Sequence, residues 1–332
     1  MSPAFARRLP ESYGAAALPR RADPSSLQRL EGRTMGTTWS LRFDNPGMLA
    51  LEDVRAAVED PLDRVVAQMS QWEPESDISR YNRAPAGSRH RLPREFASVL
   101  ACALDWARAS GGALDPTVAP LVACWGFGPE AAAAAPEPHE LADAAARVGW
   151  QRLCFERGDP SVLQPGGVVL DLSGIAKGFA VDHGVEALRA LGLRDVLFEV
   201  GGELRGAGRR PGGLPWQVQV DAGTGPALCV PLADMAVATS GDRWHVREHA
   251  GRRWSHSIDP RSGQPVSPAL AGVTVLHAQC MEADALATVL TVLGPHEGLR
   301  FADEHGIAAL FSVRGAAGLE RHASAAWKER QD

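Results

Sequence analysis

The residues best suited to chemistry lie in one short stretch near the middle of the chain. An apolar, strand-like run ends in Asp171, a turn of serine and glycine follows, and a helix is expected to begin around Lys177. The first N–H groups of a helix have no partner within the helix, and the peptide dipoles add up at that end, so such a turn attracts anions. A carboxylate, free N–H groups and an ammonium in one turn indicate a place to hold a phosphorylated ligand.

This turn is not a P-loop. Lys177 precedes Gly178, and no Gly-Lys-Ser or Gly-Lys-Thr sequence occurs. A strand–turn–helix unit that happens to carry a lysine is an equally open interpretation when these residues are considered alone.

A second stretch combines a carboxylate and a hydroxyl. Asp284 and Thr288 are four residues apart at the expected start of a helix, so both side chains lie on one face. Mg²⁺ prefers hard oxygen ligands of this kind, completed by water and substrate phosphates. The alternative is structural: an acid in the first turn is stabilised by the helix dipole without any metal.

Several side chains outside these two stretches could contact a ligand. His256 lies at the end of an alternating segment before a proline turn and could carry a proton near neutral pH, or simply hold the local structure by a hydrogen bond. Trp125 and Phe127 stand beside glycines and suit the flank of a flat ring system, or pin a loop to the core. Met35 and Trp72 are further candidates for ring contacts.

The length, composition and net charge of the chain narrow the class of protein. The 332 residues include 34 basic and 40 acidic side chains spread along the chain, and the net charge of −6 argues against a nucleic-acid or anionic-membrane surface. No apolar run approaches the roughly 20 residues of a spanning helix. The five cysteines are scattered without a CxxC pair, which favours reduced thiols over a zinc site. The N-terminal stretch has neither an apolar signal core nor a lipobox cysteine, so the sequence as it stands predicts a cytoplasmic location.

The elements that must position these groups follow from hydrophobic periodicity. Strand-like segments cluster as neighbours with helices inserted between them, which favours an α+β fold over strict α/β alternation. A hairpin is expected from 152–155 and 168–172, and 71–83 is expected to be a polar loop. No Gly-x-Gly-x-x-Gly follows a strand, so a Rossmann dinucleotide site has no support. Helices are expected at 54–69, 96–109, 140–148, 175–191, 282–293 and 296–305, and strands at 196–200, 216–220, 272–276 and 307–313. Residues 30–43 are expected to form a strand pair or one long broken strand.

Taken in order, the motifs along residues 30–313 resemble the ApbE family, the FAD:protein FMN transferases. Each motif alone is weak, but the ordered set is highly specific. The matching segments are Met-Gly-Thr-Thr at 35–38, Ser-Asp-Ile-Ser at 76–79, Asp-Pro-Thr-Val at 115–118, Trp-Gly-Phe-Gly at 125–128, the turn at 171–180, Val-Gly-Gly-Glu at 200–203, Ala-Thr-Ser-Gly-Asp at 238–242, the His256 segment at 256–265, and 281–288.

The resemblance implies both a fold and an activity. The fold is a single mixed α+β domain of the T-fold-like type, with antiparallel-rich sheets and inserted helices, over residues 28–315, with tails at 1–27 and 316–332. The activity is Mg²⁺-dependent transfer of the FMN part of FAD to a Thr or Ser hydroxyl of a partner redox protein, through a phosphoester bond and with release of AMP.

The resemblance also assigns roles, motif by motif. Asp284 and Thr288, with the backbone carbonyl of Gly174, are implied to hold Mg²⁺; the family often has alanine where Gly174 stands, and glycine keeps the carbonyl. His256 is similar to the family's candidate for proton transfer, and Lys177 and Asp284 complete the implied catalytic set. The implied FAD contacts are Met35, Trp72, Ala113, Leu114, Asp115, Asp171, Lys177 and Ile258.

Two other functions stay open from the residues. An FAD pyrophosphatase would use the same site with water in place of the acceptor hydroxyl, and a non-catalytic flavin-binding protein would need no metal. Under the main hypothesis the partners are FAD and an acceptor flavoprotein, with no nucleic acid and no transmembrane segment. Many family members are exported and membrane-anchored, so a true start upstream of Met1 would imply a periplasmic location.

Overall fold

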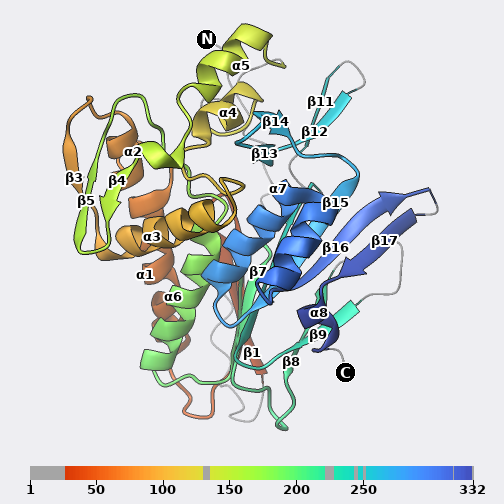
Figure 1. The fold of residues 1–332 in the computed structure, drawn as a ribbon. Helices are drawn as coiled ribbons and strands as arrows, with labels where there is room; N and C mark the ends of the chain where they lie inside the picture. The colour runs from red at the N-terminus through yellow and green to blue at the C-terminus, as the bar shows by residue number, and fades with distance from the viewer. Residues whose placement is uncertain are drawn as a thin grey trace.

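The computed structural model describes residues 27–129, 135–220, 228–242, 246–249, 252–316 and 318–330. Eight strands within these ranges form one sheet in the order β1-β2-β6-β7-β10-β15-β16-β17, and every neighbouring pair is antiparallel (Figure 1). These strands are β1 (Leu27–Thr34), β2 (Thr37–Asp44), β6 (Val196–Val200), β7 (Glu203–Ala207), β10 (Met235–Gly241), β15 (Leu270–His277), β16 (Ala308–Gly315) and β17 (Gly318–Ala323).

Smaller sheets and the helices surround this central sheet. The helices are α1 (Leu51–Met69), α2 (Asp77–Asn82), α3 (Arg94–Ala109), α4 (Ala119–Cys124), α5 (Pro138–Ala145), α6 (Ala176–Ala190), α7 (Cys280–Glu304) and α8 (Ala325–Lys328), with a short 3₁₀ turn at Trp150–Arg152. The remaining strands are β3 (Arg89–Arg91), β4 (Cys154–Glu156), β5 (Asp159–Leu163), β8 (Trp216–Val220), β9 (Leu228–Leu232), β11 (Val246–His249), β12 (Arg252–Ser255), β13 (Ile258–Asp259) and β14 (Gln264–Pro265).

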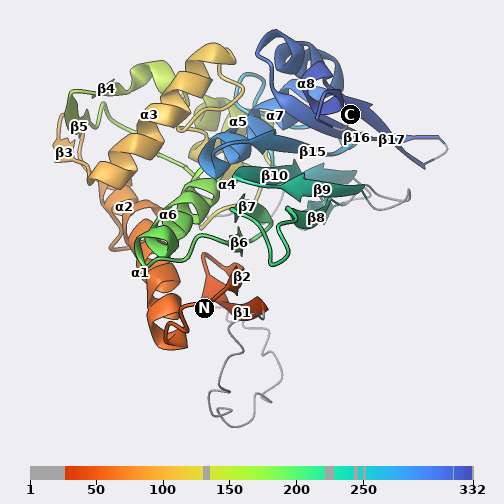
Figure 2. The ribbon, with the colours of Figure 1, turned by 90° about the horizontal axis from the view of Figure 1, so that it is seen from below.

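The central sheet is covered on both faces, and this explains its composition. Figure 2 shows α1, α3 and α6 gathered on one side of the sheet. On the other face, Trp216 of β8 and Trp327 of α8 join a separate apolar cluster with residues of the central strands. Strands buried on both faces have nearly continuous apolar sequences, whereas strands with one exposed face alternate apolar and polar residues. β6 and β15 are of the first kind. The expected α+β class, with antiparallel sheets and inserted helices, is confirmed.

Helix α7 is broken where the sequence predicts a gap between two helices. Gly294 has φ 75° and ψ 178°, a conformation outside the helical region, and Pro295 follows it directly. Proline is well accommodated at a helix start and cannot continue a helix. The expected pair at 282–293 and 296–305 is therefore confirmed.

The expected strand at 168–172 is wrong. β5 pairs instead with β4 and β3, and residues 168–172 form no strand. The side chain of Asn82 takes the place of a neighbouring strand: its Oδ1 accepts the N–H of Leu170 at 2.7 Å, and its Nδ2 donates to the Leu170 carbonyl at 3.0 Å. Leu170 can be fully buried because these bonds satisfy its backbone.

The expected polar loop at 71–83 contains a helical turn. Ser76 caps α2, because its hydroxyl accepts the N–H of Ser79 at 3.2 Å. This is an ordinary N-cap, in which a serine oxygen satisfies one of the free N–H groups.

Part of the expected C-terminal tail belongs to the fold. β17 pairs with β16 along its whole length, and Trp327 of α8 is only 3% exposed. Ser324 ties this segment down: its hydroxyl donates to the Ile307 carbonyl at 2.7 Å and accepts the N–H of Ala309 at 2.9 Å. Residues 1–26 of the expected N-terminal tail lie outside the described residues. In the part of the chain that is described, no helix has the length and apolar character needed to cross a membrane.

The burial of α8 predicts a stability effect near the C-terminus. Trp327→Ala should lower the free energy of unfolding by about 3–5 kcal/mol, because it removes a large buried side chain. Chemical denaturation measures this effect. Lys328→Ala, one residue along and exposed, is the matched control and should change little. Equal unfolding curves for Trp327→Ala and wild type would mean that this segment does not contribute to the folded core.

Candidate functional site

The site is built where the first turns of α6 and α7 touch. Gly178 packs directly on the start of α7: a Cβ at this position would overlap the carbonyl oxygen of Cys280 and lie 2.7 Å from Cβ of Asp284. The N–H of Gly178 donates to Oδ2 of Asp284 at 2.9 Å. Glycine is therefore required for the two helices to approach closely enough for this bond, and Asp284 is held over the start of α6.

A set of oxygen atoms faces this contact. Thr288 lies one turn beyond Asp284, and its hydroxyl is 3.4 Å from the carbonyl oxygen of Gly174. The structure thus brings together the three residues that the resemblance assigns to a metal. No group of three or more His, Cys, Asp or Glu side chains with metal-binding geometry occurs among the described residues. A cation held here would take one carboxylate, one hydroxyl and one backbone carbonyl from the chain.

Lys177, Glu203 and Asp284 form a charged cluster at the same place. Nζ of Lys177 lies 2.6 Å from Oε1 of Glu203, whose side chain is only 4% exposed. Burial alone would lower the pKa of Lys177, but the carboxylates of Asp284 and Glu203 outweigh it and raise that pKa. Lys177 and Asp284 therefore lie on the same side of the molecule and interact electrostatically.

The two carboxyl groups in this cluster share one cation between them. Burial raises the pKa of Glu203 to about 7; Lys177 opposes the rise and Asp284 adds to it. Burial also raises the pKa of Asp284, opposed by the Lys177 ammonium and by the N–H of Gly178. When both carboxyl groups are ionised, the cluster carries one negative charge more than its lysine can balance, which suits a site that receives a cation.

The start of α7 is fixed by a residue of α6. Asp182 accepts the N–H of Cys280 at 3.0 Å with one carboxylate oxygen and the N–H of Met281 at 2.9 Å with the other. Arg205 on β7 binds the same carboxylate at 2.9 Å. Asp182, a residue of α6, therefore caps the start of α7. This cap fixes the position of α7 relative to α6, and with it the positions of Asp284 and Thr288.

The turn that carries Asp171 is tied to the neighbouring loops. The N–H of Asp171 donates to the Pro116 carbonyl at 2.8 Å, and its carboxylate accepts the N–H of Ser173 at 2.8 Å. Gln71 donates to the Ser173 hydroxyl at 3.4 Å, which links the turn to the segment of Trp72. Trp72 is 64% exposed, so its ring is available at the surface beside this turn.

The Asp115 loop is mostly structural. Asp115 accepts hydrogen bonds from the N–H and hydroxyl of Thr117 at 2.8 and 2.6 Å and from the N–H of Trp150 at 3.0 Å. Burial raises the pKa of Asp115, and these hydrogen bonds act against the rise. Ala113 and Leu114 are buried in the main apolar core. The implied FAD contacts at 113–115 would therefore depend largely on backbone atoms.

His256 and Ile258 pack against other elements than the charged cluster does. The ring of His256 meets Phe127 edge to face with centroids 6.2 Å apart, and Trp125 meets Trp254 in the same way at 5.8 Å. Ile258 is buried in a small apolar cluster with residues of α4 and α5. Of the aromatic residues considered as flanks of a ring system, Trp125 therefore packs on Trp254 and Phe127 on His256.

Met35 lies in the turn between β1 and β2 and has a positive φ of 49°. The start of β2 packs against the turn between β6 and β7. A Cβ at Gly201 in this turn would lie 2.8 Å from the Thr37 side chain and 3.5 Å from Cδ of Lys177. The Met35 turn, the β6–β7 turn and the stem of Lys177 therefore converge.

Sequence reasoning missed Glu203 and Asp182. Glu203 falls within the quoted Val-Gly-Gly-Glu motif without a role, and Asp182 reads as an ordinary polar residue of a helix. The only sequence signal for Glu203 was an acid directly after two glycines at the start of a strand. The partners of Glu203 and Asp182 are set by tertiary packing, which this signal does not report.

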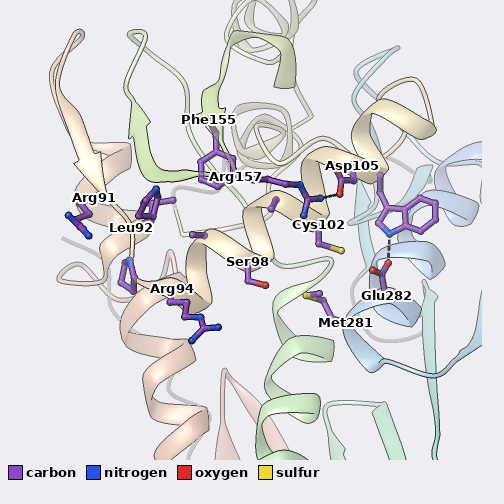
Figure 3. A pocket seen from close by; sticks show the side chains of 15 residues that line it. Arg91, Leu92, Arg94, Ser98, Cys102, Asp105, Phe155, Arg157, Met281 and Glu282 are labelled. Carbon is purple, nitrogen blue, oxygen red and sulfur yellow. Dashed lines mark hydrogen bonds and ion pairs between the residues drawn. The ribbon is translucent and has the colours of Figure 1, made fainter.

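A cavity of about 820 Å³ opens nearby but away from this site. It lies between α3, the β3–β5–β4 sheet and the first turn of α7, as Figure 3 shows, and Met281 and Glu282 line it. None of the predicted site residues lines it, because Asp284 points to α6 while Glu282 points to Trp106 of α3. The cavity and the charged cluster use different faces of α7.

Comparisons with known proteins agree with this fold. The family model described as the ApbE family matches residues 35–311. An FAD:protein FMN transferase from Haemophilus influenzae is 36% identical over 313 residues, covering 90% of this chain and 90% of the relative. One from Vibrio cholerae is 35% identical over 312 residues, covering 92% and 93%.

Solved structures show the same relationship. The apo form of the flavinyl transferase ApbE from Pseudomonas stutzeri matches with a TM-score of 0.86 at 37% identity, covering 92% of this chain and 96% of that one. The flavin transferase ApbE from Vibrio cholerae matches with a TM-score of 0.84 at 32% identity, covering 92% and 99%. The chain is thus an α+β protein of the flavin transferase class. It belongs to the ApbE family.

The raised pKa of Glu203 predicts how stability depends on pH. A carboxyl whose folded pKa lies near 7, above the ordinary 4.5, stabilises the fold below pH 4.5 and loses that contribution as the pH rises through 7. With a chelator present, the free energy of unfolding should fall by up to about 3 kcal/mol over this window. Glu203→Gln should flatten the profile in chemical denaturation, and Glu304→Gln, at an exposed position, should not. A Glu203→Gln profile as steep as wild type would assign the effect to another group.

Proposed function

We propose that this chain is an FAD:protein FMN transferase that joins the FMN part of FAD to a Thr or Ser hydroxyl of a partner redox protein. The hydroxyl oxygen forms a bond to the FMN phosphorus, and the bond from that phosphorus to the bridging oxygen breaks. AMP leaves with the bridging oxygen, and the proton of the hydroxyl passes to a base. The names of the relatives support this activity.

One observation supports the proposal most strongly. Asp284, Thr288 and the Gly174 carbonyl lie at the start of α6, where Lys177 supplies a cation. Phosphoryl transfer needs mainly positioning and charge stabilisation, and these groups can provide both. A diphosphate bound here would lie between the lysine and the three oxygen donors.

The residues present fit Mg²⁺. The excess negative charge of the charged cluster and the hard oxygen donors both favour a small divalent cation. When bound, the ion would neutralise charge on the diphosphate as the phosphorus is attacked. Asp284, Thr288 and Gly174 would hold it.

The chain's own residues have separate tasks in this scheme. Lys177 binds a diphosphate oxygen, and His256 accepts the proton of the acceptor hydroxyl or donates one to the leaving group. Met35 and Trp72 contact the flavin ring. The remaining contacts with FAD come from Ala113, Leu114, Asp115, Asp171 and Ile258.

Removing the metal-binding carboxylate should separate function from folding. Asp284→Ala should lower the rate of transfer at least about 100-fold, because a bound metal is worth several kcal/mol of transition-state stabilisation. Mass spectrometry of the acceptor measures the FMN adduct, and a thermal melt checks the fold. The fold should persist because the variant removes the surplus buried charge. Asp63→Ala, at an exposed position of α1, is the control and should transfer at the wild-type rate. Normal flavinylation by Asp284→Ala would reject the metal assignment.

Incubation with FAD and Mg²⁺ in the absence of an acceptor tests the reaction class. We expect FMN and AMP to appear far more slowly than in transfer to an acceptor, and chelation to stop transfer until Mg²⁺ is restored. Chromatography of the nucleotides measures both. Rapid FMN and AMP formation without acceptor would indicate a pyrophosphatase. Tight FAD binding that survives chelation without any turnover would indicate a flavin carrier.

A further inference from the structure

Glu203 is a buried acid for which the reaction scheme above has no role. It begins β7 directly after the Gly201–Gly202 turn, and its side chain is 4% exposed. Oε1 meets Nζ of Lys177 at 2.6 Å, while Oε2 is buried without a hydrogen-bond partner among the described residues. A half-satisfied buried carboxylate is costly, so its presence calls for an explanation.

The ion pair holds one end of a flexible side chain. The Lys177 side chain is 31% exposed, and its stem runs beside the Gly201 turn, where a Cβ would lie 3.5 Å from Cδ. An ammonium has three N–H donors. Glu203 takes one, and no other hydrogen bond or ion pair of Lys177 is formed with the residues that the structure describes. Two donors are therefore available on the open side.

A second carboxylate competes for this lysine. The charge of Asp284 also acts on Lys177, because Asp284 and Glu203 both raise the pKa of the lysine. A lysine has a long, freely rotating stem, so without a fixed partner its ammonium would move to the nearest available carboxylate. Pairing with Asp284 would occupy an oxygen of the candidate metal site. In the structure the ammonium is paired with Glu203, at the start of β7.

We propose that Glu203 is a positioning residue for the transfer reaction: it fixes Lys177 against the β6–β7 turn, off Asp284, with two N–H donors directed at the diphosphate of FAD. This inference rests on the proposed function. A donor fixed before binding loses less conformational freedom when the ligand arrives. Glu203 acts through Lys177 and touches neither FAD nor the acceptor.

Two variants separate position from charge. Glu203→Asp keeps the charge but shortens the reach by one methylene, and Glu203→Ala removes both. With Mg²⁺ present, each should weaken FAD binding about tenfold, because a charge-assisted hydrogen bond is lost. Riboflavin, which has no diphosphate, should bind as to wild type. Fluorescence of the bound flavin measures both affinities, and KM for FAD should rise more than kcat falls.

The same variants in a Lys177→Met background test the route of the effect. Lys177→Met alone should weaken FAD binding, and adding Glu203→Ala should cause no further loss, since Glu203 then has nothing to position. Glu199→Ala is the matched control: its carboxylate accepts the Gly202 N–H on the same turn at 3.0 Å but does not pair with Lys177. It should leave the ratio of FAD to riboflavin affinity unchanged.

Each other outcome overturns the inference. Wild-type FAD affinity for Glu203→Asp would mean that only charge matters, and equal losses for FAD and riboflavin would mean a scaffold role. Additive losses in the Lys177→Met background would mean that Glu203 acts independently. An unchanged FAD affinity in Lys177→Met alone would reject the proposed role of Lys177 as well, whereas a loss there without any effect of Glu203 rejects only the positioning role.

Discussion

The close contact between α6 and α7 at Gly178 is the constraint on which the candidate site depends. Only a residue without a Cβ lets the start of α6 reach the first turn of α7, and only at that separation does the Gly178 N–H meet Asp284. Asp182 fixes the same approach from the side by capping α7. The proposed metal donors, Lys177 and the turn before α6 are thus positioned by one helix–helix contact.

The charged cluster of Lys177, Glu203 and Asp284 does not by itself favour the folded state. Two buried carboxylates with one ammonium leave a surplus negative charge in a poorly solvated place, and the raised pKa values of Glu203 and Asp284 report that cost. A well-packed apolar substitute would generally be as stable or more so. Retention of such a cluster is expected where a ligand supplies the missing charge, since the surplus is then balanced on binding.

Local sequence patterns predicted much of the fold but only part of the candidate site. Periodicity predicted α3, α6 and the two parts of α7, because each buries one face at helical spacing. It failed at 168–172, where the Asn82 side chain replaces a strand partner for Leu170. Glu203 and Asp182 were missed for the same reason: their roles depend on partners 26 and 98 residues away, at Lys177 and at the start of α7, and no spacing in the sequence reports such pairs.

Under the proposed function, the arrangement would also couple the binding of the metal to the binding of the diphosphate. In the chain alone, the charge of Asp284 acts on both the Gly178 N–H and the Lys177 ammonium. A cation at Asp284 would offset that negative charge and leave the field of Lys177 directed at an anion. An anion at Lys177 would in turn draw a cation towards Asp284. Each ligand would therefore favour the other through charges already fixed by the α6–α7 contact, and linkage would make this effect equal in both directions.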